Sequence, residues 1–81
     1  MSEDRATRLK RLHMRSMRRG IKEMDLILSR FWTEAGGDLS DAELDLYEAL
    51  LGENDQDLYQ WVSGQAAAPD HFAELVLRLR K

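Results

Sequence analysis

Two helical patterns meet at a short charged segment, Arg18-Arg19-Gly20-Ile21-Lys22-Glu23-Met24-Asp25. A glycine inside a helix costs about 1 kcal/mol relative to alanine, so Gly20 predicts a joint between two helices and not a turn within one. Arginine, lysine, glutamate and aspartate surround this glycine. A charged corner between helices protrudes from a fold, and its mixed charge suits recognition of a partner better than catalysis.

Apolar residues on both sides of this corner recur at three- and four-residue spacing, which is typical of helices that pack on one face. We expect helices over residues 4–17, 21–33, 41–51 and 56–63, and a fifth with Pro69 as its first residue. The second helix is the most hydrophobic and should be central, whereas the first has a thin apolar stripe and should be the least firmly packed. The sequence therefore predicts an all-α fold, a compact bundle of five short helices in one domain over residues 1–81.

Capping chemistry predicts where these helices begin and end. Ser40-Asp41-Ala42-Glu43 is a capping box, in which the serine and glutamate side chains each bind the other residue's backbone amide. Gly52 is expected to end the third helix in a left-handed conformation. Asp55 is expected to cap the fourth helix, and either Asp4 or Ser2 the first.

The composition is that of a small soluble domain. The chain has 81 residues and no cysteine, which excludes disulfides and thiolate metal sites. Its mean hydropathy is -0.54, and no apolar run approaches the roughly 18 residues of a membrane span. The first residues lack the apolar stretch of a secretory signal, and their acidic side chains argue against a transit peptide. We expect a cytoplasmic protein without membrane insertion, although a processed organellar protein would share these features.

Charge is distributed unevenly along the chain. Residues 1–30 hold nine Lys or Arg and four Asp or Glu, a net +5, whereas residues 31–81 hold three basic and eleven acidic residues, a net -8. Such asymmetry can steer a partner or bind an anionic surface. The alternative is a basic helix that lies near the acidic half of the same domain.

Patterns typical of enzymes and metal sites are missing from the sequence. His13 and His71 lie far apart and in no metal-binding spacing, and Gly36-Gly37 lacks the lysine and hydroxyl residue of a phosphate-binding loop. The acidic residues do not follow the calcium-loop pattern. We therefore assign no catalytic, cofactor-binding or metal-binding residue and expect that the protein is not an enzyme.

The aromatic residues divide by their helical positions. Four lie on the inward stripes and are expected in the core: Phe31, Tyr47, Trp61 and Phe72. Trp32 and Tyr59 lie off these stripes. Each is interpreted either as a surface anchor for a partner or as a half-buried residue at the edge of the core.

The corner itself allows two interpretations. In the first it is a turn between helices with ordinary surface salt bridges, each worth at most about 1 kcal/mol. In the second it binds a partner. Gly20 then allows close approach of the backbone, Arg19 binds a carboxylate or phosphate with its planar fork, and Glu23 projects on the same side one turn later.

These residues carry a resemblance to a known family. Arg19-Gly20-Ile21-Lys22-Glu23 resembles the Arg-Gly-x-x-Glu signature of the SdhE-type flavin assembly factors. The similarity continues through Leu39-Ser40-Asp41-Ala42-Glu43, Tyr47, Leu50-Leu51 and the segment from Asp55 to Trp61, so that it covers residues 9 to 79. One departure is Arg15-Ser16-Met17, which lacks the large aromatic residue that many relatives carry there and so leaves the packing of the first helix open.

The resemblance implies a function. Members of the family are small helical proteins that are not enzymes. They bind the flavoprotein subunit of succinate dehydrogenase, and in bacteria that of fumarate reductase, and they promote covalent attachment of FAD to a histidine of that client. The resemblance thus implies no stably bound cofactor, action on the FAD of the client, and a monomer that binds no nucleic acid.

Site residues follow from the same resemblance. By motif position, Arg19, Gly20 and Glu23 would form the partner-binding surface, with Arg18 and Asp25 beside them. Asp55 and Asp57 match a second acidic segment of the family and join this partner-binding set.

Two other functions remain as alternatives. The basic first helix and the corner have features of a small nucleic-acid-binding module, although a pI of 5.3 and the acidic second half oppose this. The other alternative is a generic protein-docking adaptor.

Overall fold

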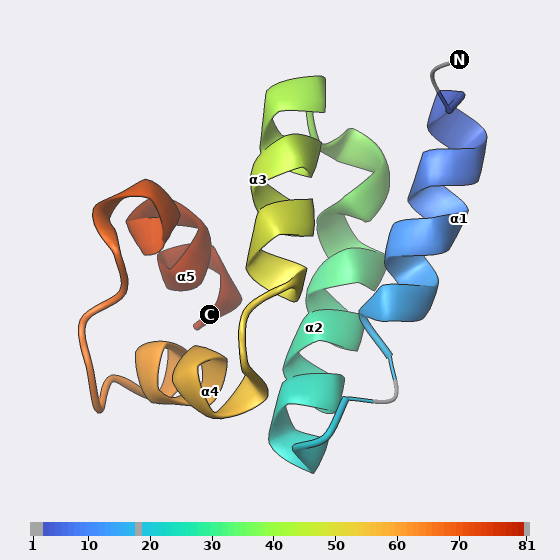
Figure 1. Ribbon diagram of the computed structural model, residues 1–81. Coiled ribbons are helices and arrows are strands. Elements are labelled where there is room, and N and C mark those ends of the chain that lie inside the picture. Colours follow the sequence, from blue (N-terminus) through green and yellow to red (C-terminus); the bar gives the residue numbers. More distant parts are fainter. Residues whose placement is uncertain (1–2, 18, 81) are drawn as a thin grey trace.

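The structure is a computed structural model that describes residues 3–17 and 19–80. Five α-helices follow one another: α1 (Arg5–Arg15), α2 (Lys22–Ala35), α3 (Asp41–Leu51), α4 (Asp55–Ser63) and α5 (Ala73–Leu79) (Figure 1). Short 3-10 turns, Gly36–Asp38 and Asp70–Phe72, precede α3 and α5, and the described ranges contain no strand. The predicted all-α bundle of five short helices is confirmed.

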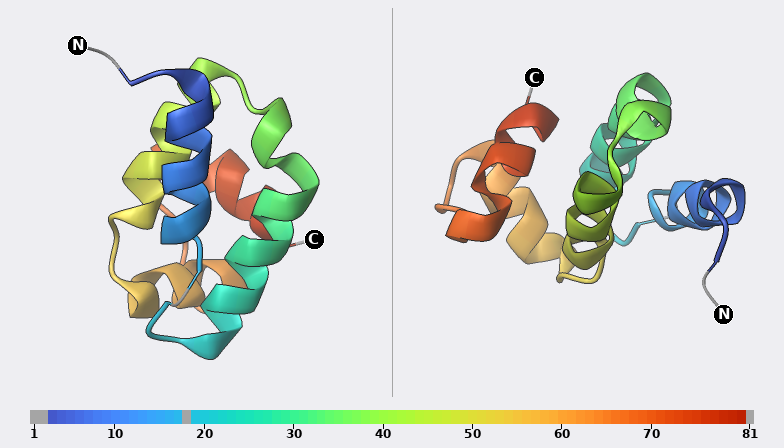
Figure 2. Two further views of the ribbon diagram at one scale, coloured as in Figure 1. Left: turned by 90° about the vertical axis from the view of Figure 1, so that its right-hand side faces the viewer. Right: turned by 90° about the horizontal axis from the view of Figure 1, so that it is seen from above.

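The helices form a layered arrangement. Helices α2 and α3 lie in the middle, α1 covers one side of them, and α4 and α5 lie together on the other side (Figures 1 and 2). The predicted central position of the second helix is therefore confirmed. None of the helices within the described ranges is long and apolar enough to cross a membrane.

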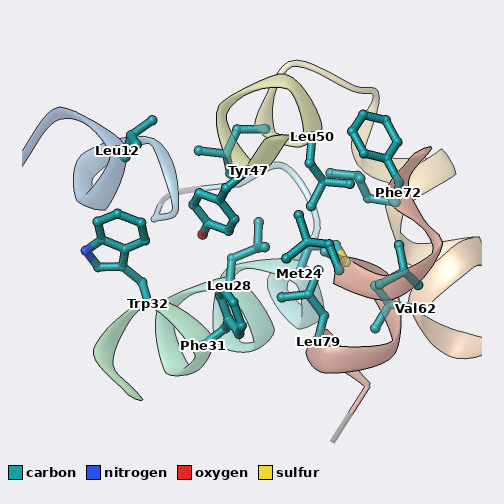
Figure 3. Packing of buried hydrophobic residues seen from close by; sticks show 14 of the residues in the cluster. Leu12, Met24, Leu28, Phe31, Trp32, Tyr47, Leu50, Val62, Phe72 and Leu79 are labelled. Atoms are coloured by element: carbon teal, nitrogen blue, oxygen red, sulfur yellow. The ribbon is translucent and has the colours of Figure 1, made fainter. Parts of the chain in front are cut away.

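A single hydrophobic core runs through these layers, with Tyr47 of α3 near its middle (Figure 3). The Tyr47 side chain is fully buried, and its ring lies 5.2 Å from the ring of Trp32 and 5.6 Å from that of Phe31. Trp32 was a candidate surface anchor, but it is only 8% exposed. Its indole covers Gly36, where a Cβ atom would come within 2.6 Å of the ring, so the glycine allows this packing.

Helix α1 joins the core through a small contact. Leu12 and Ser16 are buried, and the Ser16 hydroxyl donates to the Leu12 carbonyl at 2.8 Å. Because that proton is used, the Tyr47 hydroxyl donates to Ser16 Oγ, at 2.6 Å. Burial raises the pKa of Tyr47 to about 12. Ser16, in the segment that lacks the large aromatic residue, is thus the point where α1 bonds to the core.

Ion pairs add to this contact. Arg8 donates to Asp45 at 2.6 Å and to Glu48 at 3.2 Å, and both terminal nitrogens of Arg11 donate to Glu48. The guanidinium of Arg11, together with that of Arg8, holds the pKa of Glu48 below its ordinary value. Arg5 pairs with Asp41 one turn before Asp45. The basic first helix therefore lies against an acidic face of α3, as the second interpretation of the charge asymmetry predicted.

Two predicted helix starts are confirmed and one is wrong. Asp4 caps α1 by accepting from the Thr7 amide at 2.7 Å, whereas the alternative cap, Ser2, lies outside the described residues. The capping box of α3 is present, with both bonds between Ser40 and Glu43 formed. The predicted cap of α4 was Asp55, but Asn54 accepts from the Gln56 amide instead.

One predicted helix end and one further predicted helix start also differ from the structure. Gly52 follows α3 with φ -79°, so the left-handed cap predicted there is wrong. The left-handed glycine is Gly64, with φ 86°, at the end of α4. Pro69 precedes the 3-10 turn and not α5, which begins only at Ala73. A proline has no amide to donate, so it fits the start of this turn as well as that of an α-helix.

The ion pairs between α1 and α3 generate a prediction about stability. Glu48→Gln should lower the free energy of unfolding by roughly 0.5–1 kcal/mol at low salt, because Glu48 pairs with Arg8, Arg11 and Arg15. Its folded-state pKa lies below the ordinary 4.5, so its contribution is present above that pH and is lost as the pH falls through the lowered pKa. Urea denaturation at pH 7 and pH 3 should therefore show a difference from wild type that shrinks at pH 3.

The matched control is Asp41→Asn, because the Asp41 side chain is 88% exposed and pairs with Arg5. This variant should stay within about 0.3 kcal/mol of wild type. An equal loss in both variants would show that Glu48 has no special part in holding α1.

Candidate partner-binding site

The connection between α1 and α2 is held by an ion pair with the distant helix α4. Arg19 donates to Asp55 Oδ1 from Nε at 2.9 Å and from Nη2 at 2.7 Å. The backbone amide of Gly20 donates to the other carboxylate oxygen, Oδ2, at 2.7 Å. Both oxygens of Asp55 are thus bound by consecutive residues of the corner. We name the set of Arg19, Gly20 and Asp55 the corner clamp.

The same guanidinium also binds two helix ends. Arg19 Nη1 donates to the carbonyl of Arg15 at 3.0 Å, and Nη2 donates to that of Leu51 at 3.1 Å. Arg15 and Leu51 are the last residues of α1 and α3, where carbonyls lack partners within the helix and a cation is favourable. Asp55 is the first residue of α4, where a negative charge is favourable. One side chain therefore satisfies and positions the ends of three helices.

Gly20 is exposed, but its lack of a side chain leaves room for the carboxylate of Asp55 in the same chain. A Cβ atom at this position would lie 3.3 Å from Asp55 Oδ2, closer than an ordinary van der Waals contact. The bound carboxylate cannot retreat without lengthening its bonds to Arg19. The close approach that the sequence predicted toward a partner is thus already used toward Asp55.

The structure changes the predicted role of Arg19. Its side chain is 13% exposed and that of Asp55 is 19% exposed, so the planar fork binds a carboxylate of the same chain. The expected acid–base pair of Arg19 and Glu23 on one helix face is not formed, because α2 begins only at Lys22. Sequence reasoning missed the Arg19–Asp55 pair, which joins residues 36 positions apart. The only signal was that both belong to segments with family resemblance.

The remaining predicted residues take different positions. Glu23 is exposed in the first turn of α2 and makes no hydrogen bond or ion pair with another described residue. Asp25 is half-buried and accepts from the Ser29 hydroxyl at 3.2 Å. Asp57 is exposed in the first turn of α4. Arg18 lies outside the described residues.

An open groove of about 370 Å³ begins beside Glu23. Its apolar lining comes from three helices and consists of Leu26, Ile27, Tyr59, Val62 and Leu79. Leu26 is 63% exposed, and Tyr59 is half-buried, as one of its two interpretations predicted. The sequence showed no sign of this groove, because its lining residues meet only when α2, α4 and α5 pack together.

The corner and groove have the chemistry of a binding surface. Within the described ranges, no group of three or more His, Cys, Asp and Glu residues is placed to hold a metal ion. His13 and His71 are both exposed and belong to different helical segments. What the surface offers is an exposed carboxylate, a fixed backbone corner and an apolar groove.

Comparison with known proteins assigns the chain to a family. Residues 10–81 match the family described as the flavinator of succinate dehydrogenase. Similar proteins named succinate dehydrogenase assembly factor 2, mitochondrial, include one from Meyerozyma guilliermondii, 48% identical over 61 residues, or 75% of this chain and 45% of the relative. One from Drosophila virilis is 35% identical over 81 residues, or 98% of this chain and 51% of the relative.

A third relative of that name, from Dictyostelium discoideum, is 36% identical over 70 residues, or 86% of this chain and 50% of the relative. The chain thus spans about half the length of these relatives. Their names place them in mitochondria, whereas the cytoplasmic location of this chain stays a prediction. With residues 10–81 matched, the chain belongs to the succinate dehydrogenase flavinator family.

Proposed function

We propose that this protein is an assembly factor that binds the flavoprotein subunit of succinate dehydrogenase and promotes covalent attachment of FAD to it. Family membership supports succinate dehydrogenase as the client, and the names of the relatives support a role in its assembly. The observation that carries the proposal is the corner clamp. It holds the Gly20 backbone rigidly beside an exposed Glu23 that has no bonding partner among the described residues.

The residues of the corner clamp and Glu23 fall into two groups with different roles. Arg19 and Asp55 are positioning residues, because their charged groups bind each other and the helix ends. Gly20 and Glu23 are exposed and are the residues that would contact the client. A rigid corner loses little conformational freedom on binding, so more of the contact energy goes into affinity.

The proposed mechanism is stabilisation of one client conformation. In the reaction that the family resemblance implies, the bond forms inside the client, between its histidine and its flavin. A helper that binds better to the conformation in which these groups meet shifts the population toward that conformation. Correct orientation of two reacting groups can supply several kcal/mol of the barrier, so the helper needs no catalytic group of its own.

The structure does not favour the nucleic-acid alternative. Arg5, Arg8 and Arg11 of the basic helix are bound to acidic side chains, two of them to Glu48 on α3. Phosphate groups would have to compete with these carboxylates for the same guanidinium groups.

The corner clamp predicts a coupled loss of stability and binding. Asp55→Ala should lower the free energy of unfolding by about 2 kcal/mol, because it leaves a mostly buried arginine without its carboxylate. It should also weaken client binding, since the corner is no longer fixed. Chemical denaturation and titration calorimetry with the flavin-free flavoprotein subunit measure the two effects.

A double-mutant cycle with Arg19→Ala tests whether the two residues act together. The loss of stability in the double variant should be well below the sum of the single losses. Additive losses in stability and in binding would instead show that Arg19 and Asp55 do not act together.

A substitution of Glu23 tests whether this residue contacts the client or stabilises the fold. Glu23→Ala should leave the free energy of unfolding within about 0.5 kcal/mol of wild type, as expected for an exposed side chain. It should slow covalent flavinylation of the client by weakening the complex. Saturating amounts of the variant should restore much of the rate by mass action. The measurement is in-gel flavin fluorescence of the client against assembly-factor concentration, with Glu34→Ala, an exposed acid late in the same helix, as control.

A Glu23→Ala protein that binds the client normally but stays inactive at saturation would contradict this mechanism. Glu23 would then take part in the attachment chemistry, and the chain would be a catalyst and not a helper.

A further inference from the structure

The groove beside Glu23 has charged groups at its borders and an apolar centre. Along its α2 wall, Glu23 is followed by Leu26 and Ile27 and then by Arg30, so that acid, apolar surface and base follow one another. Glu23 and Arg30 are seven residues apart on the helix, or roughly 10 Å. The α5 side of the groove ends in a second base, Arg80.

Arg80 is available to bind an anion. It is exposed and makes no hydrogen bond or ion pair with another residue that the structure describes. Its guanidinium lies over the end of α4, where a Cβ atom at Gly64 would come within 2.9 Å of a terminal nitrogen. The two unpaired charges of the groove, on Glu23 and Arg80, therefore have opposite signs and lie on different helical walls.

We propose that this groove binds an apolar segment of the client flavoprotein that presents a basic side chain to Glu23 and a carboxylate to Arg80. The inference rests on the proposed function, and it extends the client contact from the corner onto α2, α4 and α5. A volume of about 370 Å³ is at the small end of ligand clefts, so the groove accommodates a few apolar side chains and not a whole helix. The two opposite charges would fix the direction in which the segment lies.

A second copy of this chain is a less suitable occupant. The groove is concave, and two copies facing each other would leave both hollows unfilled. A client segment with protruding apolar side chains fills the groove, covers the exposed Leu26 and satisfies both charges.

Calorimetric titration of the flavin-free flavoprotein subunit with the full chain tests this proposal. Leu26→Glu should raise the dissociation constant at least tenfold, because it places a charge in the apolar centre of the groove. Arg80→Gln should raise it less and should reduce its dependence on salt. The matched control is Leu77→Glu, since Leu77 is 55% exposed on α5 and lines a different groove. It should stay within twofold of wild type.

The outcomes separate this inference from the proposed function. If Leu26→Glu binds like wild type while Glu23→Ala loses affinity, the client contacts the corner alone and the groove proposal is wrong. Equal losses in Leu26→Glu and Leu77→Glu would also overturn it, because added negative charge would then explain both. No binding by the wild-type chain would instead overturn the proposed function.

Analytical sedimentation at several protein concentrations tests whether a second copy of this chain occupies the groove. A wild-type dimer that Leu26→Glu converts to a monomer would assign the groove to a second copy and overturn the client segment. A monomer for wild type and variant alike leaves the groove free for the client, as the proposal requires.

Discussion

The ion pair between Arg19 and Asp55 is the interaction on which the arrangement of the helix ends depends. A single guanidinium binds the last carbonyls of α1 and α3 and the first carboxylate of α4, and that carboxylate also receives the Gly20 amide. Helix ends leave backbone groups without partners, and these groups must be satisfied when the ends meet in a small fold. The clamp satisfies several of them at one point, and it fixes the angle at which α2 leaves the corner.

The rest of the fold is held in a different way on each side of the central helices. On one side, α4 and α5 contribute apolar residues such as Leu58 and Leu75 to the core. On the other side, α1 contributes Leu12 and Ser16, and its arginines bind acidic residues of α3. A domain of this size has only one modest core. Polar contacts therefore contribute a larger share of the interactions that hold the first helix against α3.

The clamp also gives the signature of the family a physical interpretation. Arg19 is required inside the protein, Glu23 is presented outside it, and Gly20 serves both purposes because its backbone approaches Asp55 while its open face remains exposed. In the function that we propose, the motif combines a structural arginine with a carboxylate that contacts the partner. Loss of function on substitution would therefore have two separate physical causes within five residues.

Local sequence patterns by themselves determined the helices, some of their caps and the apolar faces, because these depend on contacts within a few residues. Asp4 and the Ser40–Glu43 capping box are examples. They failed at Asp55, whose carboxylate is bound by Arg19 and Gly20 of the connection between α1 and α2, and at Gly52, which follows α3 with φ -79°. Resemblance to a family pointed to Arg19, Gly20, Glu23 and Asp55 without indicating how they are related.

Only the tertiary structure decided that Arg19 faces Asp55 and that Glu23 opens onto a groove. The first pair is separated by 36 positions, and the groove is lined from three helices. No periodicity or spacing in the sequence predicts these contacts, because they form only when packing of the core brings the ends of different helices to one place.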